Sequence, residues 1–227
     1  MKELFIDIMH HDLMNPLATA RGFTELIKEN DSSKMAYIET IEKNLVKAME
    51  LIESATKFSG LEGLERIDFT DMDLKQVIDG VIENLSPLAE KAGMKIENMI
   101  TGNMPVRANK IIEEVFSNLI SNAIKYASDG KRIIVKSEDR DPFWNIIIID
   151  FGEGLKNEEK AIIFDRFCRL EKKGVKGSGL GLAIVKKIIE LHRGSIGVED
   201  NPQGGAVFIV EIPKSGYVLR GVNLDAI

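Results

Sequence analysis

The first 59 residues carry two apolar stripes whose members recur in steps of three and four, and these stripes constrain the fold more than any other feature. The polar stretch KENDSSK at 28–34 separates them and has the composition that ends one helix and begins the next. One hairpin of two helices cannot bury both stripes, so pairing with a second copy into a four-helix bundle is the economical solution. The stripe residues are Ile6, His10, Leu13, Leu17, Ala20, Thr24 and Ile27 in the first helix, and Ile38, Ile41, Leu45, Ala48, Ile52 and Ala55 in the second.

Beyond the hairpin the pattern changes to mixed helix and strand. Helices and an antiparallel-leaning sheet in separate runs predict an α+β fold, in which a two-layer α/β sandwich follows the hairpin. We expect helices at 74–93, 109–127 and 179–192, and strands at 94–100, 132–139, 144–150 and in the final pair SIGVED and AVFIVEIP. The two glycines of SGLEGLER (59–66) indicate a linker, so the predicted division is 1–59 hairpin, 60–66 linker, 67–213 sandwich domain and 214–227 tail of unknown role.

Composition limits the classes of partner. The formal net charge of −6 argues against a protein that binds a nucleic-acid backbone, because such a protein needs a basic face. Cys168 is the only cysteine, which excludes an intrachain disulfide and a thiolate metal cluster. No apolar run approaches the roughly 20 residues that cross a bilayer, and the N-terminus does not resemble a signal peptide. We therefore expect a cytoplasmic chain that contacts neither nucleic acid nor membrane, although its parent protein could be membrane-anchored.

Two glycine clusters flank one polar segment of the second domain. DFGEG at 150–154 follows a predicted strand, and GVKGSGLGLAIVK at 174–186 runs into a predicted helix. Glycines at a helix N-terminus let backbone N–H groups approach an anion, and the helix dipole favours negative charge there. Either cluster alone is equally well explained by a tight turn or by helix packing, whereas the two together favour phosphate binding.

The predicted helix at 109–127 presents polar side chains on one face. Asn118, Asn122 and Lys125 follow one another by four and three residues, so they lie on the same side of the helix. Amide oxygens suit Mg²⁺, which keeps water and phosphate oxygens among its ligands, and a lysine suits the phosphates themselves. The alternative is an ordinary polar helix face, which would be preferred if this motif stood alone.

Five motifs, in this order, resemble those of sensor histidine kinases. HDLMNPL resembles the phosphoacceptor box of the dimerisation domain, and NLISNAIKYA, DFGEG, IFDRFCR and GSGLGLAIVK resemble the boxes of the ATP-binding domain. The resemblance spans residues 4–213. It implies a dimeric phosphoacceptor hairpin, which makes a homodimer through residues 1–59, followed by a domain that binds ATP and Mg²⁺.

The resemblance also implies roles for individual residues. Asp150 would accept a hydrogen bond from the adenine amine, Asn118 would hold Mg²⁺, and residues 155–178 would form a lid. Arg166 and Arg169 are candidates to contact the γ-phosphate, although solvated surface charges are an equally good interpretation. The remaining predicted nucleotide-binding residues are Asn122, Lys125, Tyr126, Gly152, Gly154, Gly177, Gly179, Leu180 and Gly181. His192, in LHRG, is expected to cap or pack a helix rather than to catalyse.

The two adjacent histidines of HHDLMNPL differ in their position on the helix. His10 falls on the apolar stripe and is expected to pack, whereas His11 lies about 100° round the helix and is the predicted phosphoacceptor. Asp12 can hydrogen-bond the imidazole Nδ1–H and leave Nε2 to attack phosphorus. Asn15 lies one turn from His11, where it can orient a water for dephosphorylation. Pro16 removes one backbone donor and could bend the helix beside His11.

Three functions are compatible with these residues. The first is a kinase that phosphorylates His11 from Mg-ATP, passes the phosphoryl group to an aspartate of a response regulator, and also dephosphorylates that regulator. The second is an ATPase whose nucleotide drives clamping, without a phosphohistidine. The third is an ATP-silent scaffold or phosphatase that binds response regulators. The intact set of motifs favours the kinase.

Overall fold

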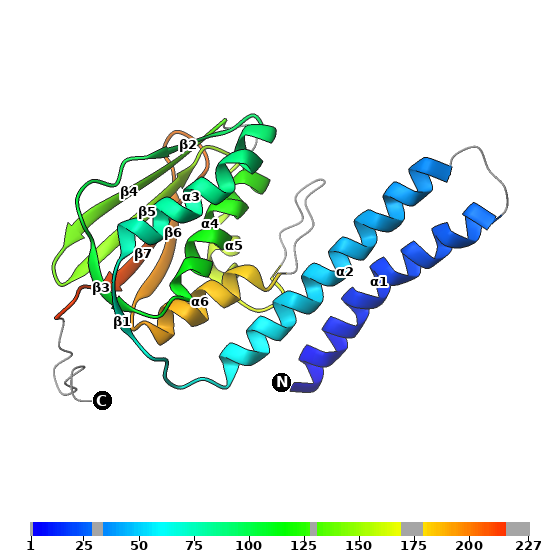
Figure 1. Cartoon of the computed structure of the whole chain (residues 1–227), viewed down its shortest axis with the longest axis horizontal. Helices are drawn as coiled ribbons and strands as arrows, with labels where there is room; N and C mark the ends of the chain where they lie inside the picture. Colours follow the sequence, from blue (N-terminus) through cyan, green and yellow to red (C-terminus); the bar gives the residue numbers. More distant parts are fainter. Residues whose placement is uncertain (1, 29–33, 128–130, 169–178, 217–227) are drawn as a thin grey trace.

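The computed structural model of the chain describes residues 2–28, 34–127, 131–168 and 179–216, and within the first range it describes the side chains of 12–27 only. A helical hairpin projects from one side of a mixed α/β domain (Figure 1). This is the α+β architecture expected from the sequence. None of the helices in these ranges is long and apolar enough to pass through a bilayer.

The hairpin consists of α1 (Lys2–Lys28) and α2 (Lys34–Glu62), which pack along their length (Figure 1). Small side chains form the contact, since Ala20 and Ala48 are 5% and 3% exposed. Near the hairpin turn the rings of Phe23 and Tyr37 lie 5.4 Å apart. The two predicted helices are confirmed, and the turn at 29–33 lies outside the described residues.

Only half of the second apolar stripe is covered within one chain. Ala48 is buried, whereas Ile38, Leu45 and Ile52 are 41%, 44% and 51% exposed. These three exposed residues are seven apart, which is the spacing of one edge of a heptad seam. The predicted dimeric bundle would cover this edge. Because the structure contains one chain, the dimer remains a prediction.

Helix α1 continues through Pro16, which is buried. A proline ring inside a helix cannot donate to the carbonyl four residues before it, here that of Asp12. The helical assignment is nevertheless unbroken from Lys2 to Lys28. The proline therefore lies inside the helix rather than ending it.

Helix α2 extends further than the sequence indicates. It runs to Glu62, so Ser59 to Glu62 of the predicted linker stretch are helical. Two tertiary contacts hold this last turn despite the glycines: Phe58 is 3% exposed, and Glu62 forms an ion pair of 2.7 Å with Arg166. The boundary between hairpin and second domain is thus set by packing against the second domain.

The second domain is built on a five-stranded sheet in the order β2-β4-β5-β7-β6. The β2–β4 pair is parallel and the other three pairs are antiparallel. Every predicted strand is present. The strands are β2 (Lys95–Asn98), β4 (Arg132–Arg140), β5 (Phe143–Asp150), β6 (Ser195–Asp200) and β7 (Ala206–Pro213).

Helices α3 (Leu74–Lys91), α4 (Ile112–Tyr126) and α6 (Gly181–Leu191) lie on one side of this sheet (Figure 1). In the described part of the chain, only one face of the sheet is buried against helices. Along strand β7, for example, alternate residues are buried, while the residues between them are partly exposed. Its buried residues Ala206, Phe208, Val210 and Ile212 face the helices. The predicted two-layer sandwich is therefore confirmed.

Three short elements escaped the sequence analysis. Strands β1 (Thr70–Asp73) and β3 (Pro105–Ala108) form a separate antiparallel pair, and α5 (Asn157–Ile162) follows β5. Asp73 joins β1 to α3 as an N-cap, since its Oδ1 accepts from the backbone N–H of Lys75 at 3.0 Å and of Met104 at 2.9 Å. All three elements are six residues long or shorter.

Candidate functional site

One cavity of about 1050 Å³ lies between the hairpin and the α/β domain. Helices α1, α2 and α4, the end of β5 and the start of α6 all contribute to its wall. The predicted site residues that line it are Asp12 and Asn15 from the hairpin, and Asn118, Asn122, Lys125, Tyr126, Asp150, Gly154, Gly179 and Gly181 from the α/β domain. Residues predicted from four separate motifs thus border one space.

Helix α4 turns its polar face to the cavity and its apolar face to the core. Asn118, Asn122 and Lys125 line the cavity, while Leu119 and Ile120 are at most 1% exposed. The four-and-three spacing of the polar residues produces this division, as expected from helix geometry.

The side-chain amide of Asn118 is held in one orientation. Its Nδ2 donates to the backbone carbonyl of Glu114 at 2.9 Å and to Oε1 of the same residue at 3.2 Å. Its Oδ1 points to the first residue of α6, because a Cβ added at Gly181 would lie 2.9 Å from that oxygen. The amide oxygen is therefore directed to the helix N-terminus where the glycine cluster ends.

Asp150 ends β5 with its carboxylate fixed by the backbone. Its Oδ1 accepts from the N–H of Gly152 at 3.0 Å and of Ala206 at 3.1 Å, and its carbonyl accepts from Asn201 Nδ2 at 2.8 Å. Gly205 has φ +95°, and a Cβ there would lie 2.2 Å from the Asp150 carbonyl oxygen. Only glycine permits this approach.

Some predicted nucleotide-binding residues lie away from the cavity. Gly152 packs against Ala127 at the end of α4, and the Leu180 side chain is completely buried in the core. Neither residue lines the cavity. Leu180 can therefore offer a ligand only its backbone, while Arg169 and Gly177 lie outside the described residues.

The described part of the predicted lid contacts both domains. Phe164 meets Phe208 edge-on with ring centroids 6.5 Å apart, and the Phe167 N–H donates to the Gly179 carbonyl at 2.8 Å. Arg166, a candidate phosphate contact, instead pairs with Glu62 of α2, and its guanidinium lies 4.8 Å from the Phe58 ring centroid. In this arrangement Arg166 does not line the cavity, and its side chain is partly exposed to solvent.

The predicted phosphoacceptor segment borders the cavity through Asp12 and Asn15. Asp12 is half-buried and Asn15 exposed, both on α1, and the Thr19 hydroxyl donates to the Asn15 carbonyl at 2.9 Å. His10 and His11 belong to the same helix, and their side chains lie outside the described residues.

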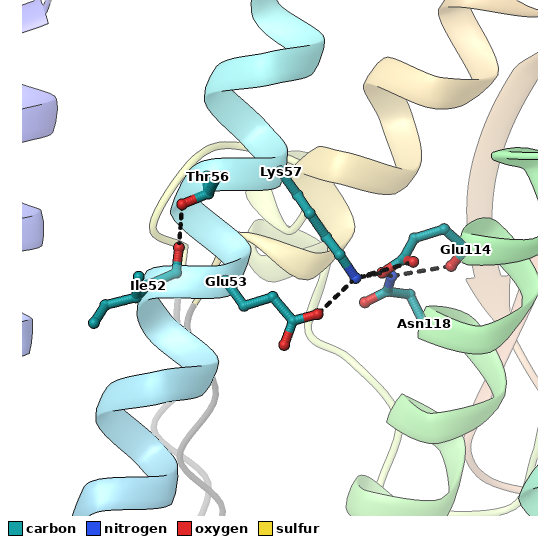
Figure 2. Close-up of polar contacts among 6 residues, drawn as sticks. All are labelled: Ile52, Glu53, Thr56, Lys57, Glu114 and Asn118. Atoms are coloured by element: carbon teal, nitrogen blue, oxygen red, sulfur yellow. Dashed lines mark hydrogen bonds and ion pairs between the residues drawn. The ribbon is translucent and has the colours of Figure 1, made fainter.

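A polar cluster joins α2 to α4 beside Asn118 (Figure 2). The Lys57 ammonium lies 3.1 and 3.2 Å from the two carboxylate oxygens of Glu114, and 3.1 Å from Oε1 of Glu53. Burial disfavours the charged lysine, but the hydrogen bonds and charges of Glu114 and Glu53 outweigh it and raise the pKa of Lys57. Lys57 is therefore a persistent cation at the cavity wall.

His192 is a structural residue, as expected. It is 4% exposed, its Nε2 accepts from the Asn109 N–H at 3.0 Å, and its Nδ1 lies 2.7 Å from the Ile188 carbonyl oxygen. These partners require a proton on Nδ1 and none on Nε2. Burial lowers the pKa of His192, which keeps the ring neutral.

Glu114 and Lys57, which bind each other at the cavity wall, were not predicted. Glu114 precedes Asn118 by one helical turn, so the i, i+4 spacing on the helix could have indicated it. Lys57 comes from the hairpin, and no local pattern relates it to α4. Its place depends on how the two domains pack.

A metal ion would need ligands from outside the protein. Across the described ranges, no three His, Cys, Asp or Glu side chains gather closely enough to hold one. The Asn118 amide oxygen, with the Glu114 carboxylate beside it, does suit Mg²⁺, which prefers oxygen ligands and completes its shell with phosphate and water.

Two family models match the chain in succession. Residues 1–64 match the His Kinase A (phospho-acceptor) domain, and residues 108–216 match the histidine kinase-, DNA gyrase B- and HSP90-like ATPase family. The second range contributes most of the residues of the cavity wall, among them those of α4, β5 and α6.

Curated relatives align with nearly the whole chain. The phytochrome-like protein Cph1 of Synechocystis is 32% identical over 218 residues, which is 92% of this chain and 29% of that protein. The heme sensor protein HssS of Staphylococcus saprophyticus is 29% identical over 94% of this chain and 47% of its own length. The chain thus spans roughly a quarter to a half of the curated relatives that it matches.

Solved structures share the fold. The Acinetobacter baumannii histidine kinase AdeS aligns over 91% of this chain and 98% of its own, with 25% identity and a TM-score of 0.72. The histidine kinase ThkA, solved in complex with response regulator protein TrrA, aligns over 91% of this chain and 60% of its own, with 27% identity and a TM-score of 0.74. With two successive domain matches, these relatives and the same fold, the chain belongs to the sensor histidine kinases of two-component systems.

Proposed function

We propose that this chain is a histidine kinase core that transfers the γ-phosphoryl group of Mg-ATP to His11 and then to an aspartate of a response regulator. One observation carries the proposal. The cavity that is lined by Asp150 and Asn118 in the α/β domain is also lined by Asp12, the residue that follows His11 in α1. A substrate bound by the first pair would share one space with the acceptor helix.

The ATP-binding residues divide by chemistry. The Asp150 carboxylate is a hydrogen-bond acceptor held at the end of β5, which suits the exocyclic amine of adenine. Lys125 and the N-terminus of α6 at Gly181 also line the cavity and offer positive charge to the phosphates, and Asn122 and Tyr126 line it as well.

Asn118 is the proposed metal ligand. Mg²⁺ would neutralise charge on the terminal phosphates of the substrate. The protein's part is to direct the Asn118 amide oxygen, through the hydrogen bonds from its Nδ2 to Glu114, to the phosphate-binding end of α6.

Asp12 is the proposed base for the transfer. The neutral His11 imidazole attacks the γ-phosphorus through Nε2, the bond from phosphorus to the leaving oxygen of ADP breaks, and Asp12 accepts the Nδ1 proton. The same core would also act as a phosphatase. In that activity Asn15 would orient a water during dephosphorylation of the regulator. The exposure of Asn15 at the cavity wall supports this second activity.

The proposed partners are a response regulator and a second copy of the chain. ThkA was solved with its regulator, and by similarity we assign such a partner here. The uncovered edge formed by Ile38, Leu45 and Ile52 supports dimerisation through the hairpin, because these side chains would otherwise remain in water.

Phosphorylation with γ-³²P-ATP and Mg²⁺ tests the proposal. We expect a protein phosphate that is labile to acid and stable to base, lost in His11→Gln and kept in His10→Gln. Label retained by His11→Gln would overturn the acceptor assignment. ATP hydrolysis without protein labelling would indicate the clamping ATPase, and absence of ATP binding would indicate the scaffold.

A further inference from the structure

The cluster around Lys57 links the hairpin to the proposed metal ligand in two contacts (Figure 2). The Lys57 ammonium binds both oxygens of the Glu114 carboxylate, and one of these oxygens accepts from the Asn118 amide. Lys57 belongs to α2, whereas Glu114 and Asn118 are one turn apart on α4. A change at either end of this chain of contacts therefore reaches the other.

Glu114 and Asn118 together offer the oxygen chemistry that a divalent cation prefers. A carboxylate and an amide oxygen one helical turn apart lie on the same face, and both residues line the cavity. In the present arrangement the cation at the carboxylate is the lysine. The Glu114 side chain is 35% exposed and that of Lys57 is 42% exposed, so both can exchange partners without unfolding the core.

Electrostatics gives the direction of the effect. A lysine held at Glu114 places a positive charge one carboxylate away from Asn118, where it repels a divalent cation. It also neutralises the carboxylate that would otherwise attract that cation. The hydrogen bonds that raise the pKa of Lys57 keep this charge in place at neutral pH.

We propose that Lys57 is a competing cation: docking of the hairpin on α4 and binding of Mg²⁺ beside Asn118 draw on the same carboxylate, Glu114, and oppose each other. This inference rests on the proposed function, because it concerns the metal site of the same nucleotide pocket. By linkage, a filled metal site loosens the hold of α2 on α4, and the docked hairpin weakens metal binding by the same factor.

The test is the Mg²⁺ concentration that half-saturates binding of a non-hydrolysable ATP analogue, AMPPNP, to the full chain by calorimetry. We expect Lys57→Met to lower this concentration about three- to tenfold, since a repelling charge several ångströms from a divalent cation is removed. Lys57→Arg keeps the charge and the contact, so it should behave like the unmodified chain.

A double-mutant cycle separates the contact from a general change in charge. In a Glu114→Gln background Lys57 no longer has a carboxylate on α4 to bind and keeps Glu53 on its own helix, so adding Lys57→Met should change the half-saturating concentration less than twofold. Lys75→Met is the matched control, because Lys75 pairs with Asp79 on α3, away from the cavity, and its loss changes net charge equally. This control should leave Mg²⁺ binding unchanged.

The outcomes separate this inference from the proposed function. If AMPPNP fails to bind at saturating Mg²⁺, the nucleotide site itself is wrong. If AMPPNP binds but Lys57→Met leaves the half-saturating concentration unchanged or raises it, the competition is wrong and the kinase assignment stands. An equal effect of Lys75→Met would also overturn the competition.

A second measurement keeps both residues in place. Spin labels on cysteines introduced at the exposed positions Lys43 of α2 and Glu83 of α3, in a Cys168→Ser chain, report the distance between hairpin and α/β domain. Saturating Mg²⁺ with AMPPNP should broaden or shift this distance, and AMPPNP with a chelator should not. A distance that ignores the metal would overturn the linkage.

Discussion

The backbone N–H of Asn109 donates to Nε2 of His192 at 3.0 Å, although 83 residues separate the two. Asn109 also holds the chain entering β1, since its Nδ2 donates to the Asp68 carbonyl at 2.8 Å, and the Phe69 ring lies 5.5 Å from the imidazole. One neutral imidazole thus joins the end of α6, the start of α4 and the segment before β1.

This arrangement makes the stability of the α/β domain depend on pH. Burial lowers the folded-state pKa of His192 below the usual 6.5, so between those two values the unfolded chain binds more protons than the folded one. The contribution is complete above about pH 6.5 and is lost as the pH falls through that value toward the folded-state pKa. Urea unfolding followed by the fluorescence of Trp144, the single tryptophan, should show this loss. It should be smaller in His192→Gln, and equal slopes in both chains would contradict the assignment.

Gly181→Ala should weaken binding of Mg²⁺ and nucleotide at least about tenfold, because the added methyl group meets Oδ1 of Asn118, the proposed metal ligand, at 2.9 Å. Calorimetry with AMPPNP measures the loss. Gly60→Ala is the matched control, since a Cβ at that helical glycine has nothing within 4 Å. It should bind nucleotide normally and gain up to about 1 kcal/mol of stability from helix propensity.

Asp150→Asn should reduce ATP affinity by about a hundredfold and narrow the preference for ATP over GTP. The substitution removes a charged acceptor that is fixed by two backbone donors, and charge-assisted hydrogen bonds are the stronger ones. Competition binding with both nucleotides measures the two effects. Asp139→Asn, which breaks an exposed pair with Lys214, should change neither, and an unchanged ATP affinity in Asp150→Asn would remove the residue from the site.

Leu45→Glu should convert dimers to monomers, because Leu45 belongs to the uncovered edge of the hairpin and a charge there cannot be buried cheaply. Light scattering over a concentration series measures the shift, which should be at least about tenfold in the dimer dissociation constant. Lys43→Glu, an exposed change on the same helix, is the control. Equal dimerisation in all three chains would place the interface elsewhere.

Long periodic segments made most of the fold predictable. The long helices and the five strands of the main sheet follow from apolar spacing, which is seen again in the buried face of β7 and in the apolar and polar faces of α4. The pair β1–β3 was not predicted from the sequence, in which Asp73, the residue that caps α3, looks like a turn residue.

The site was predictable where motifs carry its chemistry locally, and not where packing places the partner. Motifs point to Asp150 and Asn118, and both residues line the cavity. Lys57 reaches Glu114 from another domain, and Arg166 reaches Glu62 in the same way, so neither contact has a local signature. The glycines of SGLEGLER likewise indicate a linker from residue 60, whereas α2 continues to Glu62 because tertiary contacts of Phe58 and Glu62 hold its last turn.

The complete burial of Leu180 has a mechanical consequence for the residues around it. Leu180 stands directly before α6, and its carbonyl accepts from the Ile184 N–H at 2.8 Å, so the first turn of that helix is anchored to the hydrophobic interior. The electropositive N-terminus of α6 is therefore held in a fixed position relative to the core, and a phosphate group bound there would meet backbone N–H groups that are already in place.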